Sequence, residues 1–510
     1  MERLYNNVIL EDGFDKVGSD PDRVPYLENP PEVIDVTVGR QLFVDGFLIE
    51  KTDLTPEYHK AKKLECNPVL KPEMPWEIEQ SPVACPKSGG VFFDEEAGLF
   101  KIWYEGGWLR NMCYATSRDG ISFEREDLGI VPGTNIILPY EGYEPERYRG
   151  GIDYLRPDST TVFIDYDADK SEKYKLFLRN PGGFARGIAA VSADGIRYRD
   201  FRYSGIMGDR STVFYNPLRR KWVCSIRGVE GEGQGINRIR KYHEGDSIYE
   251  AIDYNYDELP VWIRADGKDI PHPEIGIPPQ LYNLDAIAYE SITVGMFQSL
   301  LGPVNEDCAV SGIPKMTALI PMYSRDGYHF SRPSREPIIS SSFEKGAWDR
   351  GYVQSVGGGI VINGDELRIY YIGFAGDESR GGESWITNGM YRNGATGIAT
   401  LRRDGFVSMN GEGALLTRRL RFSGKRSLHV NIAGSVSCEI LDGSGALIRG
   451  SKKFVGDSTN ARLDFGDLDI GELCGRVIRL RFSVSGKLYS FGFADGAGDF
   501  GGAHGAGMVK

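Results

Sequence analysis

Metal-binding patterns of histidine and cysteine are absent from this sequence. Its six histidines form no His-x-His or His-Glu-x-x-His arrangement, so neither a structural zinc site nor a zinc-protease site is expected. The seven cysteines are dispersed and include no Cys-x-x-Cys pair, which favours reduced thiols over a disulfide framework. We therefore assign no cofactor; a structural calcium held by oxygen ligands in a channel is the metal most compatible with the sequence.

An excess of positive charge and long apolar runs are also missing. The formal charge of −12 argues against binding to nucleic acid or to an anionic membrane, because both need a cationic surface. No apolar run approaches the ~18 residues of a membrane helix, and the first residues, MERLYNNVILEDGFDKVG, lack the basic and apolar regions of a signal peptide. We expect a cytoplasmic protein without nucleic-acid or membrane partners. The sequence is also compatible with a homo-oligomer.

Glycine and tyrosine are abundant, and one short phrase recurs. CYATSRDGISFER begins at Cys113, AVSADGIRYRDF at Ala190, MYSRDGYHFSRP at Met322 and ATLRRDGFVSM at Ala399. Asp-Gly suits a tight turn because glycine accepts a positive φ while aspartate bonds the nearby backbone. With a degenerate copy around Asp246, the phrases mark five units of roughly 70 residues each. We expect the repeated aspartates to form turns on the outer rim of the fold rather than in a central channel.

Hairpin patterns precede these turns and indicate the fold. Segments such as GGVFFDEEAGLFKIWYEGG and GGIVINGDELRIYYIGF read as strand, charged tip and second strand. A unit of three or four antiparallel strands is a propeller blade, and radially packed blades leave only short edges. We predict an all-β protein with an irregular arm over residues 1–33, a catalytic five-bladed β-propeller over 34–410 and a β-sandwich over 411–510. In the sandwich, Ile478, Leu480, Phe482 and Val484 alternate onto one strand face.

Acids near the starts of the inner strands are the candidate site residues, because those starts converge at one end of a propeller channel. Tryptophans near these segments could stack on the apolar face of a sugar. The candidates are Trp76, Glu77, Glu79, Trp108, Asp158, Asp209, Arg210, Asp285, Glu290, Trp348, Asp349 and Arg350.

The order of units, the S-x-D-G-aromatic repeats and the trailing sandwich resemble the five-bladed propeller glycosidases, the group of invertases, fructanases and arabinanases. In that group an acid of blade one is nucleophile or base, an Asp entering blade three stabilises the transition state, and a Glu entering blade four is the general acid. GDRS with Asp209 is similar to the blade-three element, and AYES with Glu290 to the element opening blade four. No N-D-P-N-G-like stretch marks blade one, so Glu79, Glu77 or an acid of blade two is left for that role.

Cleavage of a glycosidic bond needs one protonated carboxyl group and one ionised carboxylate. Glu290 has β-branched and aromatic neighbours, which would raise its pKa, whereas Asp209 stands beside Arg210 and would stay ionised. The leading hypothesis is a glycoside hydrolase acting on a small oligosaccharide or glycoside, with furanosides among the candidates. A phosphorylase of the mannoside type would need an anion pocket, for which Arg210 and Arg350 are candidates. A non-catalytic carbohydrate-binding propeller would require Asp209 or Glu290 to point away from the channel.

Overall fold

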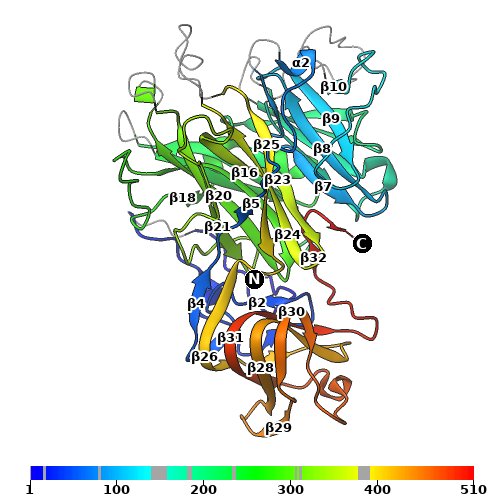
Figure 1. The fold of residues 1–510 in the computed structure, drawn as a ribbon, viewed down its shortest axis with the longest axis vertical. Coiled ribbons are helices and arrows are strands. Elements are labelled where there is room, and N and C mark those ends of the chain that lie inside the picture. The colour runs from blue at the N-terminus through cyan, green and yellow to red at the C-terminus, as the bar shows by residue number, and fades with distance from the viewer. Residues whose placement is uncertain are drawn as a thin grey trace.

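The computed structural model confirms the prediction of an all-β protein (Figure 1). It describes residues 2–14, 19–78, 82–138, 158–180, 186–231, 237–304, 307–308, 313–376 and 391–509. The described helices are single turns, such as α1 (Pro25–Glu28), α2 (Pro75–Ile78) and α3 (Ile248–Ile252). A larger upper body and a smaller lower body of strands lie end to end, each with its own cluster of buried apolar side chains.

The upper body is a β-propeller built from antiparallel units of four strands. The first three units consist of β7 (Gly90–Asp94), β8 (Leu99–Gly106), β9 (Asn111–Ser117) and β10 (Ile136–Leu138); β11 (Asp158–Ile164), β12 (Tyr174–Asn180), β13 (Arg186–Ser192) and β14 (Arg199–Ile206); and β15 (Thr212–Asn216), β16 (Lys221–Glu230), β17 (Asn237–Gly245) and β18 (Val261–Arg264). The fourth and fifth consist of β19 (Gln280–Glu290), β20 (Ile292–Gly302), β21 (Met316–Ser324) and β22 (Ile339–Ser340); and β23 (Gly351–Asn363), β24 (Glu366–Phe374), β25 (Ala395–Arg402) and β5 (Lys62–Lys63).

The inner strands of these units form a closed ring. β7, β11, β15, β19 and β23 each contact the next, and β23 contacts β7 again. β7 and β23 also pair in parallel, with Gly90 opposite Gly357. The outer position of the last unit is filled by β5, which comes from the beginning of the chain and pairs with β25. The first and last units are thereby held together, and the inner strands all start at the same end.

The repeated Ser-x-Asp-Gly phrase forms one turn at three places. In the first unit the Ser117 hydroxyl accepts the Gly120 amide at 2.9 Å, and Asp119 Oδ1 accepts the two amides after Gly120, each at 2.8 Å. The turns at Asp194 and Asp326 have the same bonds. These aspartates form turns at the ends of third strands, where the sequence places them.

Each of two such turns is docked on the neighbouring unit by an aromatic side chain. The Trp103 indole N–H donates to the Gly195 carbonyl at 2.7 Å, and the Tyr370 hydroxyl donates to the Gly120 carbonyl at 2.8 Å. Gly195 has a φ of +76°, and a Cβ there would lie 2.7 Å from the Trp103 ring. The phrase therefore recurs because the turn fastens one unit to the next and has room only for glycine.

The fourth repeated aspartate, Asp404, has a different role. It is buried and accepts hydrogen bonds from the Tyr289 hydroxyl at 2.6 Å, Arg40 Nη1 at 3.0 Å and the Ser490 hydroxyl at 2.6 Å. These partners come from the propeller, the N-terminal segment and the C-terminal sheet, so Asp404 joins the two bodies.

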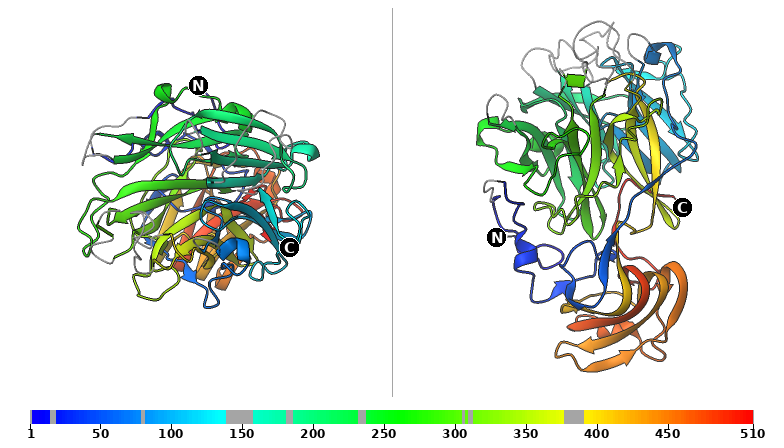
Figure 2. Two further views of the ribbon diagram at one scale, coloured as in Figure 1. Left: turned by 90° about the horizontal axis from the view of Figure 1, so that it is seen from above. Right: turned by 60° about the vertical axis from the view of Figure 1, so that its left-hand side comes forward.

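The lower body is one hydrogen-bonded, curved sheet (Figure 2). Its strands are β1 (Ile34–Asp35), β2 (Gln41–Leu42), β3 (Ile49–Thr52), β4 (Thr55–Tyr58), β26 (Val407–Thr417), β27 (Leu420–Arg421), β28 (Ser427–Asp442), β29 (Leu447–Gly450), β30 (Phe454–Arg462) and β31 (Ile478–Ala494). The predicted apolar face of β31 is confirmed, since its residues Ile478, Leu480, Phe482 and Val484 are all buried.

Two segments lie in a different body from the one that the sequence suggests. Residues 34–58 belong to the lower sheet, because β1 to β4 pair with β26, β27 and β31. The last residues return to the propeller, where β32 (Ala503–His504) pairs with β19 and β33 (Met508–Val509) pairs with β23. Strand alternation predicts which face is buried, but it does not say which strand is the partner.

The N-terminal arm packs along the junction of the two bodies. Asn6 Nδ2 donates to the Arg325 carbonyl at 2.7 Å, and the Tyr26 hydroxyl donates to the His329 carbonyl at 3.3 Å. All seven cysteines are free thiols, as their dispersed positions predict. Within the described ranges, no helix is both long enough and apolar enough for a membrane crossing.

Candidate functional site

Strained backbone marks the common end at which the inner strands start. Ser88, Ser159, Arg210 and Tyr352 have φ values of +72°, +52°, +61° and +47°. Each lies at or just before the start of a different inner strand. Such left-handed residues cost about 1–3 kcal/mol each and persist only where the surroundings fix them, which occurs most often at functional sites.

Ser88 connects four units at this end of the ring. Its side chain is fully buried, and its hydroxyl oxygen lies 3.0 Å from Arg210 Nη2, 3.0 Å from Asn283 Nδ2 and 3.1 Å from Gln354 Nε2. These donors come from the third, fourth and fifth units, whereas Ser88 precedes β7 of the first. Side chains from around the ring therefore converge on one atom.

Two buried carboxyl groups share the ammonium of Lys87. Lys87 Nζ lies 3.3 Å from Asp158 Oδ1 and 3.1 Å from Glu105 Oε2, and Arg179 Nη1 donates to Asp158 Oδ2 at 2.8 Å. Burial opposes ionisation of Asp158, but the charges of Lys87, Arg179 and Arg210 outweigh it and lower its pKa to about 2. Burial raises the pKa of Glu105, and the charge of Asp158 adds to the rise. The two carboxyl groups are thus pushed toward opposite protonation states.

Asp285 is a third buried carboxyl group, on β19. Its Oδ2 accepts the Ser355 hydroxyl at 2.6 Å and Asn283 Nδ2 at 2.9 Å. Burial raises the pKa of Asp285, and the hydrogen bond from Ser355 and the charges of Arg210 and Arg240 limit the rise. A carboxyl group that keeps its proton to a higher pH is suited to donating that proton.

Aromatic rings form a wall beside these carboxyl groups. Trp108 and Tyr391 stack with their centroids 3.7 Å apart, and Lys87 Nζ lies 3.7 Å from the centroid of Trp108. The hydroxyls of Tyr391 and Tyr282 are 3.5 Å apart, and the Tyr282 ring meets that of Tyr352 edge-on at 5.4 Å. Flat apolar faces with polar tips are the surface on which a sugar ring can stack.

Asp209 is the carboxylate of this group that a ligand could reach. Its side chain keeps 40% of its surface exposed and forms an ion pair with Arg227 Nη1 at 2.8 Å. Its charge raises the pKa of both Tyr352 and Tyr391, although burial is the larger cause. Asp209 is therefore exposed, and its charge acts on both tyrosines of the aromatic wall.

Positive charge exceeds negative charge at this site. Arg238 and Lys315 lie over the Tyr282 ring, at 5.5 and 5.2 Å from its centroid. Within the described part of the chain, neither these two cations nor Arg210 and Arg240 have a carboxylate within ion-pair distance. Arg240 Nη1 instead donates to the Arg210 carbonyl at 2.7 Å. Burial, together with the charges of Arg227 and Arg210, lowers the pKa of Arg240 to about 9. A site of this kind attracts anions.

The structure brings together a part of the predicted site. Asp158, Asp209 and Arg210 lie at inner-strand starts, and Trp108 lies beside them through its contact with Lys87. Asp285, in the middle of β19, reaches the same group through Asn283 and Ser355. Glu79, predicted as a catalytic residue, lies outside the described residues.

Glu290 lies at the other end of its strand. The prediction that it opens the fourth unit is wrong, because β19 begins at Gln280 and ends at Glu290. Its carboxylate accepts Arg403 Nη2 at 3.1 Å and the Arg40 amide at 3.1 Å, next to the lower body. Asp285 is five residues earlier, about 16 Å along the strand. The pattern AYES fits a strand end as well as a strand start, so the sequence could not distinguish them.

Two further candidates hold the first unit together. Glu77 is fully buried and accepts the Tyr104 hydroxyl at 2.7 Å and Arg125 Nε at 2.8 Å. The Trp76 indole N–H donates to Asn135 Oδ1 at 3.1 Å. These contacts are within the first unit and do not reach the converging inner strands.

The candidates before β23 serve the outer part of the fifth unit. Asp349 Oδ2 lies 2.6 Å from Lys63 Nζ, so it fastens β5, and Trp348 packs on the Tyr371 ring at 5.4 Å. Arg350 Nη1 donates to the Gly376 carbonyl at 3.0 Å. The structure thus places these residues in packing and strand closure, away from the Ser88 cluster.

Several site residues are not among the sequence candidates, which are acids, tryptophans and two arginines near strand starts. Lys87 and Ser88 stand in CPKSGG directly before β7, and Tyr282 and Asn283 lie at the start of β19. A search for any polar side chain at these positions would have found them. Glu105 is the next-to-last residue of β8, and only the antiparallel pairing brings the end of β8 beside the start of β7.

The described residues contain no group of three or more histidine, cysteine, aspartate or glutamate side chains that could hold a metal ion. The acids of the site are instead neutralised by lysine and arginine. A structural calcium in the channel stays a prediction.

No protein-family model and no curated protein sequence matches this chain. Several solved structures are similar in backbone. An N-acetylgalactosamine deacetylase from F. plautii is 14% identical, with a TM-score of 0.40 over 73% of this chain and 96% of that one. A thermostable family-43 glycoside hydrolase is 11% identical, with a TM-score of 0.43 over 64% and 91%. A protein of the GH130 family of mannoside phosphorylases and glycoside hydrolases is 15% identical, with a TM-score of 0.41 over 69% and 97%. Neither these identities nor these TM-scores assign a function to this chain.

Proposed function

We propose that the five units are the blades of a five-bladed propeller and that the site at its inner-strand starts cleaves a glycosidic bond. The substrate would be a small oligosaccharide or glycoside. The observation that carries this proposal is the presence of one buried and one exposed carboxyl group beside an aromatic wall. Burial raises the pKa of Asp285, whereas the side chain of Asp209 keeps 40% of its surface exposed. Separated protonation states of neighbouring carboxyl groups are the requirement for acid and base roles at one pH.

The roles follow from exposure and environment. Asp285 is the proton donor to the leaving oxygen, because burial favours its protonated form. Asp209 is the carboxylate that acts on the sugar or on water, because its side chain is exposed at the site. Asp158 holds Lys87 and stays ionised. The stacked rings of Trp108 and Tyr391 bind the sugar face.

Hydrolysis of nitrophenyl furanosides and pyranosides, short fructans and short arabinans tests these roles. We expect Asp209→Asn and Asp285→Asn each to lower kcat/KM by about 10²–10⁴-fold. The matched control is Glu290→Gln, a buried carboxylate at the far end of β19 that should leave kcat/KM unchanged. In the wild type, the alkaline limb of the pH profile should lie above the ordinary aspartate pKa of about 3.9. Activity lost with Glu290→Gln but kept in the two aspartate variants would contradict the assignment.

A second candidate is phosphorolysis of a glycoside, favoured by the excess of positive charge. Arg210, Arg238 and Lys315 form no ion pair within the described residues, and they could hold the phosphate that replaces water as the attacking group. The same panel with and without inorganic phosphate separates the two reactions. Turnover only with phosphate would select phosphorolysis. A silent panel with retained sugar binding would favour a non-catalytic carbohydrate-binding propeller.

The remaining expectations belong to the same proposal. Short glycosides taken up by the cell would be the substrates of a cytoplasmic enzyme, and the lower sheet would be the β-sandwich that follows the propeller. Cell fractionation and size-exclusion chromatography with light scattering test the location and the oligomeric state.

A further inference from the structure

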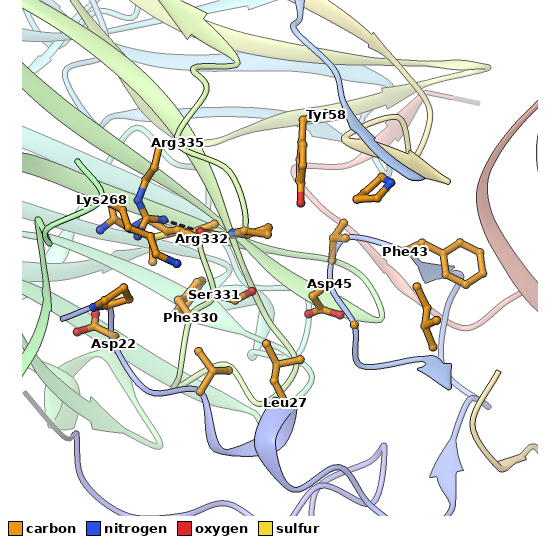
Figure 3. A pocket seen from close by; sticks show the side chains of 18 of the residues that line it. Asp22, Leu27, Phe43, Asp45, Tyr58, Lys268, Phe330, Ser331, Arg332 and Arg335 are labelled. Carbon is orange, nitrogen blue, oxygen red and sulfur yellow. Dashed lines mark hydrogen bonds between the residues drawn. The ribbon is translucent and has the colours of Figure 1, made fainter. Parts of the chain in front are cut away.

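A cavity of about 600 Å³ lies at the junction of the two bodies, away from the inner-strand starts (Figure 3). Three parts of the chain form it. The N-terminal arm contributes Leu27, the lower body contributes Tyr58 and Met409, and the propeller contributes Phe330 and Arg332. A volume of this size is typical of pockets for small molecules.

The walls of this junction cavity are largely apolar. Leu27, Phe43, Met322, Phe330 and Met409 line it. Apolar walls of this kind favour a ligand with an apolar body, because its binding removes apolar surface from water.

An aromatic ring stands across the cavity from a group of cations. Tyr58 keeps 37% of its surface exposed. Figure 3 shows it on the side opposite Lys268, Arg332 and Arg335, which gather together. The cavity thus offers a ring to stack on at one side and positive charge at the other.

Two of the three acids that line the cavity, Asp45 and Asp266, are neutralised by arginine. Asp266 Oδ2 accepts Arg332 Nη2 at 2.7 Å and Arg335 Nη2 at 2.6 Å. Asp45 Oδ1 lies 2.9 Å from Arg325 Nη2. These carboxylates therefore have little capacity left to bind a cation or a hydroxyl group.

Two cations of the lining have no such partner. Within the ranges that the structure describes, neither Lys268 nor Arg418 forms an ion pair. A cation that lines a cavity without an ion-pair partner is stabilised when a carboxylate or a similar planar anion binds to it.

We propose that the junction cavity binds a small organic carboxylate with an apolar body, such as a ring or a short alkyl chain. Lys268 and Arg418 hold the carboxylate, and the apolar walls and Tyr58 enclose the body. Because the cavity is lined by the arm, the propeller and the lower sheet, the ligand stabilises their association. The site is separate from the one proposed for glycosidic bonds and does not depend on it.

Isothermal titration of the full chain tests this proposal with two probes, 4-phenylbutyrate and its neutral counterpart 4-phenyl-1-butanol. We expect 4-phenylbutyrate to bind at least 10-fold more tightly than 4-phenyl-1-butanol. Added salt should weaken the binding of the carboxylate but not that of the alcohol. The double variant Lys268→Met with Arg418→Met should lower carboxylate affinity at least 10-fold and leave alcohol affinity unchanged. The melting temperature should rise with the carboxylate in the wild type and should rise less in this double variant.

The matched control is Lys51→Met with Arg421→Met, which removes the same charges from exposed strand positions outside the cavity lining. It should bind 4-phenylbutyrate as the wild type does. Equal binding of acid and alcohol, or no binding of either, would overturn the proposal. If the cavity variant and the control variant lost the preference for 4-phenylbutyrate equally, the preference would be a general effect of protein charge. That result would overturn the proposal as well. The salt dependence in the wild type decides the matter if the double variant does not fold.

Discussion

Asp94 ties the first propeller unit to the second, and its replacement gives a quantitative test of the structure. It is 1% exposed, and its carboxylate lies 2.7 Å from Lys101 Nζ, 2.8 Å from the Tyr174 hydroxyl and 3.2 Å from Lys173 Nζ. Burial opposes its ionisation, but the hydrogen bonds and charges of Lys101, Tyr174 and Lys173 outweigh it and lower the pKa of Asp94 from 3.8 to about 2.

The lowered pKa of Asp94 can be converted into stability. It corresponds to about 2.4 kcal/mol of the free energy of unfolding at neutral pH. Because the pKa is depressed in the folded state, this contribution is present above the unfolded value of 3.8 and is lost as the pH falls toward about 2. At pH 3 about 1.3 kcal/mol remains.

Thermal unfolding of Asp94→Asn measures this contribution. For a cooperative unit of a few hundred residues, we expect the melting temperature to fall by about 3 °C at pH 7 and by about half as much at pH 3. The matched control is Glu96→Gln, which also removes an ion pair with Lys173 but from a side chain that is 64% exposed. It should change the melting temperature very little. An equal loss for Asp94→Asn at both pH values would refute the reasoning.

Three further predictions concern the contacts between units and bodies. Trp103→Phe removes the donor to the Gly195 carbonyl and should cost about 1–3 kcal/mol of unfolding free energy, measured by chemical denaturation. Glu290→Gln breaks a buried ion pair with Arg403 and should cost about 3 kcal/mol in the same assay. Truncation of residues 503–510 removes the strands paired with β19 and β23 and should lower the melting temperature.

Each of these predictions has a contradicting result. The control for Trp103→Phe is Trp222→Phe, a change of the same size in a buried side chain of β16, and equal losses in the two variants would contradict a specific role for the hydrogen bond. An unchanged unfolding free energy for Glu290→Gln would show that its ion pair does not hold the junction. A truncated chain that melts like the full chain would show that the tail does not support the inner strands.

The local chemistry of the sequence was sufficient to predict the strands and turns. The Ser-x-Asp-Gly turns at Asp119, Asp194 and Asp326 form with the bonds that their residue types imply. The alternation around Phe482 gives the buried face of β31. These features depend on residues close together in the chain. The sequence named Asp158, Asp209 and Asp285 as candidates, but their convergence depends on the closed ring of units that are distant in the chain.

Which strands pair and which side chains meet across long distances in the chain was decided by the tertiary structure alone. Nothing near β1 to β4 indicates that they pair with strands after residue 407, and nothing in AYES indicates that Glu290 ends its strand and meets Arg403. Ser88 receives side chains from three other units, and the junction cavity is lined by three separate parts of the chain. Alternation and turn chemistry act over a few residues, whereas strand pairing and the meeting of side chains depend on the packing of the whole chain.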